Sequence, residues 1–292
     1  MNSNEQIAMR VSLVSIIWNV VLSFFKLFAG IFAHSGAMIS DAIHSASDVL
    51  STVIVMIGVK IANKESDDTH PYGHERMECV AALILAVILF ATGIGIGYQG
   101  ILIIMSGDYS HLTVPGVLAL AAAVISIGVK EGMYWYTRAA AKKIDSGALM
   151  ADAWHHRSDA LSSIGSFAGI LGARMGYPVL DPIASVIICA FILKAAFDIF
   201  MDSINKMTDA ACDNETIEKI REIILQQDGV IKIDQLKTRL FGDKIYVDTE
   251  IQVNGDISLR AAHDIAHNVH DAIEDGIQKV KHCMVHINPN ED

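Results

Sequence analysis

Six apolar runs, each long enough to cross a bilayer as a helix, take up most of the first 208 residues. They cover residues 11–33, 37–62, 79–105, 114–136, 146–171 and 183–200. A spanning helix needs about 20 consecutive apolar residues, because the hydrocarbon core of a bilayer is about 30 Å thick. The chain is 52% hydrophobic and only 19% charged, which is less charge than a soluble protein of this length normally has. We therefore expect an α-helical membrane protein with six transmembrane helices.

Basic residues flank these runs almost entirely on one side. They are Arg10, Lys60, Lys64, Arg76, Arg138, Lys142 and Lys143, whereas the opposite side has little beyond Arg174. Cytoplasmic loops are enriched in Lys and Arg, so the first side is expected to face the cytoplasm. Six spans return the chain to that side, which predicts cytoplasmic termini and a place in the inner or plasma membrane. No cleavable signal peptide is expected, because residues 1–10 are polar and the first apolar run is too long.

The composition changes near residue 209 to that of a small soluble domain. Residues 215–227 and 258–274 are expected to be helices, and 231–240, 244–253 and 279–287 strands, with a hairpin signal at Gly242-Asp243. Alternate residues of the second strand would share one face: Ile245, Val247, Thr249, Ile251 and Val253. The order α-β-β-α-β predicts a ferredoxin-like or metallochaperone-like α+β domain over residues 209–292, after a transmembrane domain over residues 1–208.

The overall charge excludes some partners. The chain has 22 Lys and Arg against 33 Asp and Glu, a net charge of -11, which argues against nucleic acid and favours cationic partners. Four cysteines lie without any C-x-x-C pair, so isolated reduced thiols are expected: Cys79, Cys189, Cys212 and Cys283. The spans contain no H-E-x-x-H motif, so we do not expect an enzyme.

Ionisable residues interrupt the second apolar run. Asp41, His44 and Asp48 lie at i, i+3 and i+7, so one face of the helix carries all three. An ionisable group at membrane depth costs about 3 kcal/mol on insertion scales. These three residues therefore imply a compensating partner, which is a bound cation, an opposite charge or a water-filled cavity.

A second polar stripe lies in residues 146–171 and comprises Asp152, His155, His156 and Asp159. His155 and Asp159 repeat the i, i+4 spacing of His44 and Asp48. Two helices that each offer one imidazole and one carboxylate can build the four-ligand shell that tetrahedral Zn²⁺ accepts, at about 2.0–2.2 Å per ligand. The alternative is a buried network of hydrogen-bonded His and Asp side chains that tightens the packing of the helices.

Taken together, these features resemble the cation diffusion facilitator family. The resemblance rests on six spans, an HxxxD motif in the second and fifth spans, the loop sequence DDTHPYGHER and the α-β-β-α-β tail. It implies a homodimeric exporter in the lipid bilayer that exchanges a cytoplasmic divalent metal for protons by alternating access. The transport site would be His44, Asp48, His155 and Asp159.

The metal implied by the resemblance is Zn²⁺, because this His/Asp plus His/Asp combination is similar to that of the zinc-preferring branch. Aspartate in place of the first histidine is associated in the family with broader selectivity, including Fe²⁺ and Cd²⁺. Imidazole and carboxylate also suit Mn²⁺, Fe²⁺ and Co²⁺, so an exporter of Mn²⁺, Fe²⁺, Co²⁺ or Cd²⁺ from the same family is an alternative. Metal ligands must be deprotonated, and imidazole in water titrates near pH 6.5, so protons and metal would compete for one site.

A second metal site is implied in the loop between the second and third spans. Asp67, His70 and His74 match the family pattern DxxHxxxH position for position. We expect this loop to bind metal rather than to transport it. The alternative is a solvated loop whose histidines have no role.

A third site is implied in the soluble domain, at the dimer interface. The matching positions are Asp234, Asp248, His263, His286 and Asn288. Only two of them keep an imidazole, so weaker binding or a harder ion is expected, with a structural or regulatory role for the metal. His267 and His270 would lie on an amphipathic helix, where scattered polar histidines need no function, and His282 is in the same domain.

Four further residues have expected roles beside these sites. The resemblance implies that Arg76 and Asp209 interlock between subunits at the membrane surface. Asp41 lies one turn from the ligand pair, toward the external end, and is expected to help at the outward vestibule. His156 adjoins His155, and we expect it to support that ligand or to handle protons.

Three other classes of function fit parts of the sequence. A divalent cation channel would show flux without counter-movement of protons. A membrane metalloenzyme would need a three-ligand site with an open position for water. A metal sensor would use the soluble domain as its output, which the poor match of that domain to a strong site disfavours.

Overall fold

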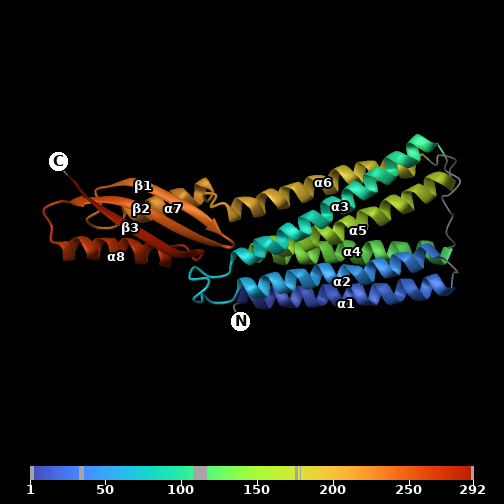
Figure 1. The fold of residues 1–292 in the computed structure, drawn as a ribbon, viewed down its shortest axis with the longest axis horizontal. Helices are drawn as coiled ribbons and strands as arrows, with labels where there is room; N and C mark the ends of the chain where they lie inside the picture. Colours follow the sequence, from blue (N-terminus) through green and yellow to red (C-terminus); the bar gives the residue numbers. More distant parts are fainter. Residues whose placement is uncertain (1–2, 33–35, 108–116, 175–176, 178, 291–292) are drawn as a thin grey trace. The chain divides into compact units, whose positions relative to one another are not determined.

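The computed structural model describes the chain except residues 1–2, 33–35, 108–116, 175–176, 178 and 291–292. It divides into two compact units, Met1–Ser203 and Ile204–Asp292. The first unit is helical and the second combines helices with a sheet (Figure 1).

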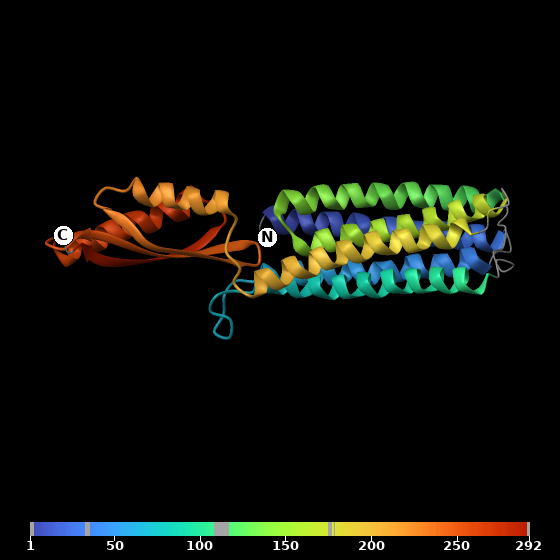
Figure 2. The same ribbon diagram turned by 90° about the horizontal axis from the view of Figure 1, so that it is seen from above.

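Six long helices run up and down through the first unit (Figures 1 and 2). They are α1 (Ser3–Phe32), α2 (Gly36–Ala62), α3 (Arg76–Ser106), α4 (Val117–Ile144), α5 (Gly147–Arg174) and α6 (Leu180–Met207). Several helices continue beyond the apolar runs that predict them, because polar residues such as those at the start of α1 prolong a helix as readily as apolar ones.

Within the described residues, two helical stretches are apolar and long enough to cross a membrane by length and composition, Asn4–Phe28 and Arg76–Ser106. α5 shows why a predicted span can miss this criterion, since Asp152, Arg157 and Asp159 all lie in its first half. The six helices occupy the six predicted spans, and the crossing of all six stays a prediction.

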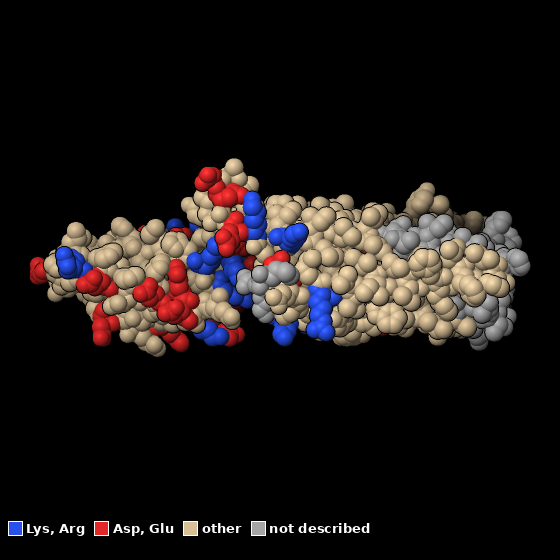
Figure 3. All heavy atoms as spheres, turned by 90° about the horizontal axis from the view of Figure 1, so that it is seen from below, with Lys and Arg blue, Asp and Glu red and all other residues tan. Residues whose placement is uncertain are grey.

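The outer surface of this unit is apolar. The face shown in Figure 3 carries almost no Lys, Arg, Asp or Glu along most of the length of the helices. Large side chains point outward, including Phe24 of α1 at 69% exposed and Phe191 of α6 at 61%. Such a surface suits lipid, which is as apolar as these side chains.

The interior of the unit combines branched apolar side chains with several small ones. Ala81 and Ala82 of α3 and Ala148 and Ala151 of α5 are all buried in one cluster. Small residues at an interface let two helix backbones approach closely. α2 approaches α3 closely at Gly58, where an added Cβ would overlap the Cβ of Ala81.

The second unit confirms the predicted α-β-β-α-β order. Its elements are α7 (Asn214–Leu225), β1 (Lys232–Phe241), β2 (Lys244–Asn254), α8 (Leu259–Gly276) and β3 (Val280–Asn290). The sheet order is β1-β2-β3, with β1 antiparallel and β3 parallel to β2. The turn between β1 and β2 is made by Gly242, whose φ of 66° favours glycine, and by Asp243.

Both helices of this unit pack on one face of the sheet, as the alternation in β2 predicts. Ile245, Val247, Thr249, Ile251 and Val253 are all buried. The helices supply the opposite half of the core through buried Ile220, Ile224, Val269 and Ile273. Asp213 caps the N-terminus of α7: its carboxylate accepts the backbone N–H and the hydroxyl of Thr216, each at 2.9 Å, and these bonds lower the pKa of Asp213.

Candidate metal centre

Three predicted ligands converge inside the helical unit. Asp48 of α2 and His155 and Asp159 of α5 offer ligand atoms that all lie within 4.8 Å of one another, and all three side chains are buried. His155 Nε2 lies 3.5 Å from Asp48 Oδ1. α5 contacts α2, α3 and α4, so its central position brings the i, i+4 pair to Asp48.

The spacing of these atoms suits a small cation. Two ligands about 2.1 Å from a tetrahedral ion lie about 3.4 Å apart. The distance of 3.5 Å from His155 Nε2 to Asp48 Oδ1 is close to that value. One imidazole and two carboxylates are also ligands that Zn²⁺ and other divalent transition ions accept.

A lysine that we did not identify from the sequence belongs to this group. Lys130 of α4 is 2% exposed, and its Nζ donates to Asp48 Oδ2 at 2.5 Å and to Asp159 Oδ2 at 2.8 Å. The sequence does contain a signal for it, because a lysine lies inside an apolar span, where a charge is costly unless it has a partner. The amine places a positive charge between the two carboxylates.

Two members of the first polar stripe have side chains that lie outside the described part of the structure. They are His44 and Asp41, both in α2. The helix places His44 one turn before Asp48. Its part in the site stays a prediction.

The other half of the polar stripe of α5 forms a separate buried pair. His156 Nε2 lies 3.5 Å from Asp152 Oδ2, and both residues are fully buried. The hydroxyl of Thr52 in α2 donates to Asp152 Oδ1 at 3.1 Å. Consecutive residues of a helix point about 100° apart, so His156 lies beside Asp152, and His155 joins Asp48.

The loop between α2 and α3 brings together Asp67, His70 and His74. His70 Nδ1 lies 3.5 Å from Asp67 Oδ1, and His74 Nε2 lies 3.6 Å from Asp67 Oδ2. The two rings are 4.4 Å apart, and His74 is buried. Lys64 Nζ donates to Asp67 Oδ2 at 2.5 Å, so a lysine amine lies on the shared carboxylate here too.

Hydrogen bonds hold the loop carboxylate in its charged form. Lys64, Thr69 and the backbone N–H of His70 all donate to Asp67, and they hold its pKa well below the usual value of 3.8. The resulting contribution to stability is complete above that value and is lost only as the pH falls through the lowered pKa. Asp67 therefore stays available to a cation in mildly acidic solution.

We expect Asp67→Asn to remove metal binding from the loop, because the histidines then lack their charged partner. Isothermal titration of the detergent-purified protein with Zn²⁺ should show about one bound ion fewer per chain, with maximal transport changed by less than about twofold. Asp68→Asn, at the adjacent exposed aspartate, is the matched control. Equal stoichiometry in both variants would contradict a loop site.

The ligands predicted in the second unit are dispersed within one chain. Asp234 accepts hydrogen bonds from Asn288 Nδ2 at 2.9 Å and Gln252 Nε2 at 3.0 Å, and the first of these contributes most to its lowered pKa. Asp248, His263 and His286 join no group of three metal-binding side chains in the part of the chain that the structure describes. Their prediction concerns an interface between two chains, and it stays a prediction.

Arg76 and Asp209 belong to different units. Arg76 is the first residue of α3, and Asp209 follows α6 with a φ of 60°. Their interlocking between two subunits stays a prediction.

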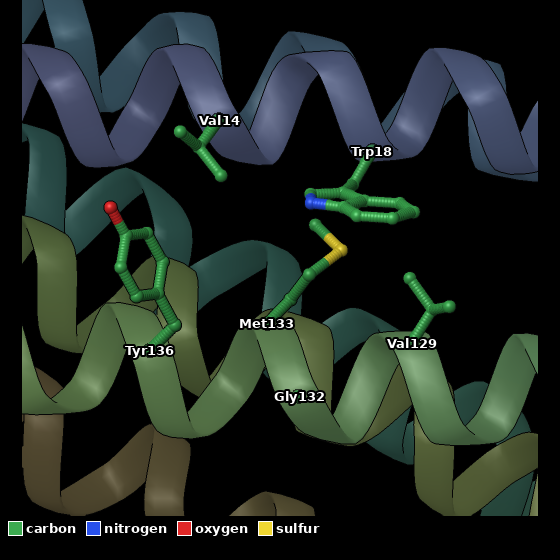
Figure 4. A pocket seen from close by; sticks show the side chains of 6 residues that line it. All are labelled: Val14, Trp18, Val129, Gly132, Met133 and Tyr136. Carbon is green, nitrogen blue, oxygen red and sulfur yellow. The ribbon is translucent and has the colours of Figure 1, made fainter.

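The helical unit also has an apolar pocket of about 470 Å³ between α1 and α4 (Figure 4). Its lining is Val14, Trp18, Val129, Gly132, Met133 and Tyr136. This lining offers no carboxylate, imidazole or thiolate, so the pocket is unsuited to a metal ion.

Comparisons with known proteins agree with this organisation. Residues 12–208 match the family described as the cation efflux transmembrane domain, and residues 212–290 match the cation efflux protein, cytoplasmic domain. The chain is 37% identical over 275 residues to an uncharacterized transporter of Methanocaldococcus jannaschii, which covers 94% of this chain and 96% of the relative. It is 32% identical over 295 residues to the manganese efflux system protein MneP of Bacillus subtilis, covering 99% and 98%. Metal tolerance protein 2 of Oryza sativa subsp. japonica is 36% identical over 293 residues, covering 92% and 75%.

Proposed function

Because this chain belongs to the cation diffusion facilitator family of membrane-embedded divalent metal exporters, we propose that its cargo is Zn²⁺ and that protons move in the opposite direction. The observation that supports this most is the buried group of Asp48, His155 and Asp159. His44 would complete the shell from the preceding turn of α2.

The charges of the group suit a divalent cargo. Two carboxylates balance the charge of a divalent ion, and neutral imidazole adds none. A buried charge without balance is costly in an apolar interior. Once the Lys130 amine has left the two carboxylates, a loaded site with Asp48, Asp159 and neutral histidines is therefore compatible with a position inside the helical unit.

Lys130 gives the empty site a balancing cation of its own. Its amine donates to one oxygen of each carboxylate, at 2.5 Å from Asp48 Oδ2 and 2.8 Å from Asp159 Oδ2. The cargo and the ammonium group repel each other and compete for the same oxygen atoms. We infer that the arriving metal displaces Lys130 from the carboxylates and that the amine returns when the metal leaves.

Proton exchange would follow from the same ligands. A proton and a metal ion occupy the same lone pair of an imidazole or carboxylate, so binding of one releases the other. In the inward-facing state Zn²⁺ displaces protons from the site. On the outer side, protons displace the metal and the protonated carrier returns.

The second unit supports assembly as a homodimer. It matches the cytoplasmic domain of cation efflux proteins, and in the family this domain lies at the subunit interface. We propose that both termini are cytoplasmic, that the protein lies in the inner or plasma membrane, and that residues 1–208 and 209–292 are its two domains.

Manganese is the second candidate cargo. The relative MneP is called a manganese efflux system protein and is 32% identical over nearly the whole chain. Carboxylate ligands suit Mn²⁺, although a given site with nitrogen and oxygen ligands binds Zn²⁺ more tightly than Mn²⁺. Selectivity would then depend on the geometry of the site and on the metals available in the cell.

Metal uptake into proteoliposomes tests both proposals. With an acidic lumen and an imposed pH gradient, we expect Zn²⁺ uptake that stops when an ionophore collapses the gradient. When unlabelled Zn²⁺, Mn²⁺, Fe²⁺, Co²⁺ and Cd²⁺ are each added to compete with the uptake of labelled Zn²⁺, we expect unlabelled Zn²⁺ to inhibit at the lowest concentration. Uptake that persists without the gradient would indicate a channel, and strongest inhibition by Mn²⁺ would assign the manganese function.

A further inference from the structure

Three side chains with metal-binding groups meet at the free edge of the sheet in the second unit. His270 and Glu274 lie one turn apart on α8, and His282 lies on β3. Both imidazoles face the same carboxylate oxygen, Glu274 Oε1, with His270 Nε2 at 3.2 Å and His282 Nδ1 at 3.5 Å. One ligand atom from each residue lies within 4.8 Å of the other two.

The backbone of β3 fixes the orientation of two of these side chains. β3 is an edge strand, and His270 Nδ1 lies 2.6 Å from the carbonyl oxygen of Cys283. A carbonyl can only accept, so Nδ1 carries the hydrogen. Glu274 Oε1 in turn accepts the backbone N–H of Cys283 at 3.0 Å. The ring nitrogen that remains on His270, Nε2, is thereby turned toward Glu274.

This arrangement suits a cation. In a neutral His270 whose Nδ1 carries the hydrogen, Nε2 presents a lone pair to the lone pairs of Glu274 Oε1 at 3.2 Å. A positive charge between the two atoms replaces this repulsion by attraction. A metal-bound histidine usually donates its other ring N–H to a carbonyl or carboxylate, as His270 does to Cys283.

The distances also suit coordination. Two ligands about 2.1 Å from a tetrahedral zinc ion lie about 3.4 Å apart, and Glu274 Oε1 lies 3.2 Å from His270 Nε2 and 3.5 Å from His282 Nδ1. The elements that carry the ligands are anchored in the core by fully buried Val269 and Ile273 and by Cys283, which is 1% exposed. The ligand side chains themselves are between 29% and 48% exposed, so an ion can reach them from solvent.

We propose that His270, Glu274 and His282 form a metal site for Zn²⁺ or an ion of similar softness such as Co²⁺ or Ni²⁺, with an open fourth position. The site is independent of the proposed transport function and of the predicted ligands Asp234, Asp248, His263 and His286. Two imidazoles favour the later ions of the transition series over Mn²⁺. The bound ion ties α8 to β3, so it stabilises the second unit when cytoplasmic metal is plentiful.

An alternative role for these side chains, without metal, is to satisfy the backbone groups of the edge strand β3, and this role accounts for only part of the geometry. The bonds from His270 and to Glu274 satisfy the backbone C=O and N–H of Cys283, which an edge strand otherwise leaves open to pairing. That role requires neither His282 nor the approach of Nε2 to Glu274. A proton on His270 Nε2 would also produce that approach, whereas a shared metal ion accounts for it together with the position of His282 on the same carboxylate oxygen.

Metal binding by the full-length protein in detergent tests the site. Equilibrium dialysis with Zn²⁺ should show about one ion fewer per chain in His282→Ala, through a loss of affinity of at least about tenfold at this site. Glu274→Gln keeps an acceptor for the Cys283 N–H but removes the charge of the side chain, so it should weaken the binding of the same Zn²⁺ ion. With Co²⁺, the absorption of one tetrahedral ion per chain should be lost in both variants.

His267→Ala is the matched control, because His267 Nδ1 lies 3.5 Å from Asp271 Oδ1 at the same i, i+4 spacing, but this pair joins no group of three metal-binding side chains among the described residues. This variant should bind metal like the unaltered protein. Repeating the dialysis with Asp159→Asn in every protein distinguishes this site from the proposed transport site. Adding His282→Ala to Asp159→Asn should still remove about one bound Zn²⁺ per chain, because the two sites share no residue. Unchanged Zn²⁺ stoichiometry and Co²⁺ absorption in Glu274→Gln and His282→Ala would overturn the proposal.

Discussion

Asp159→Asn is expected to abolish pH-driven Zn²⁺ uptake, lowering the initial rate at least about 100-fold. The substitution keeps the shape of the side chain but removes a metal ligand and one of two buried negative charges. An uncompensated buried charge costs about 3–5 kcal/mol, which corresponds to a factor of about 100 or more. The measurement is the initial rate of uptake into proteoliposomes, with an indicator of Zn²⁺ inside. Asp48→Asn should have the same effect, because both carboxylates face Lys130 and the cargo.

Asp198→Asn is the control for this substitution. Asp198 lies on α6 in an exposed pair with Lys194, at 2.9 Å, so the same chemical change there removes no buried charge. Its uptake should match that of the unaltered protein. Full uptake by Asp159→Asn would exclude the proposed transport site.

Lys130→Met is expected to lower the stability of the metal-free protein and to raise its affinity for Zn²⁺. Removal of one partner from a buried ion pair leaves two carboxylates unbalanced, at about 3–5 kcal/mol, which should lower the melting temperature by about 5–10 °C. Added Zn²⁺ should restore it, because the ion now supplies the missing charge. With the competing amine gone, Zn²⁺ affinity should rise at least about tenfold, and turnover should fall because release is slower.

The experiment is thermal unfolding in detergent with and without Zn²⁺, together with a binding titration. Lys194→Met is the control, since its pair with Asp198 is exposed and such pairs contribute about 0–1 kcal/mol. Lys130→Arg keeps the charge and should retain most of the stability without metal. A Lys130→Met protein with unchanged melting temperature and Zn²⁺ affinity would show that the amine does not compete with the cargo.

Spacing along the sequence was sufficient to predict one half of the metal centre. Residues i and i+4 of a helix share a face, so the pairing of His155 with Asp159 follows from the sequence alone. The fold of the second unit was predictable for a similar reason, because the alternation from Ile245 to Val253 fixes which side of β2 is buried.

Relations between different helices could not be obtained in this way. The sequence shows a lysine in the fourth apolar run, but its partners depend on how far α4 is rotated about its axis relative to α2 and α5. The same rotation decides that His155 and not His156 meets Asp48. The position of His282 beside His270 and Glu274 could not be predicted from the sequence either, because it depends on the place of β3 at the edge of the sheet.

The contact between Gly58 and Ala81 bears on how the cargo could be exposed to either side. Gly58 lies ten residues beyond Asp48 on α2, which is about 15 Å along the helix. If α2 pivots against α3 at this contact, a tilt of about 10° moves Asp48 by about 2.6 Å. That displacement approaches the separation between two ligands of one ion. A small angular change at a point without side-chain bulk would thus be enough to assemble or break the coordination shell.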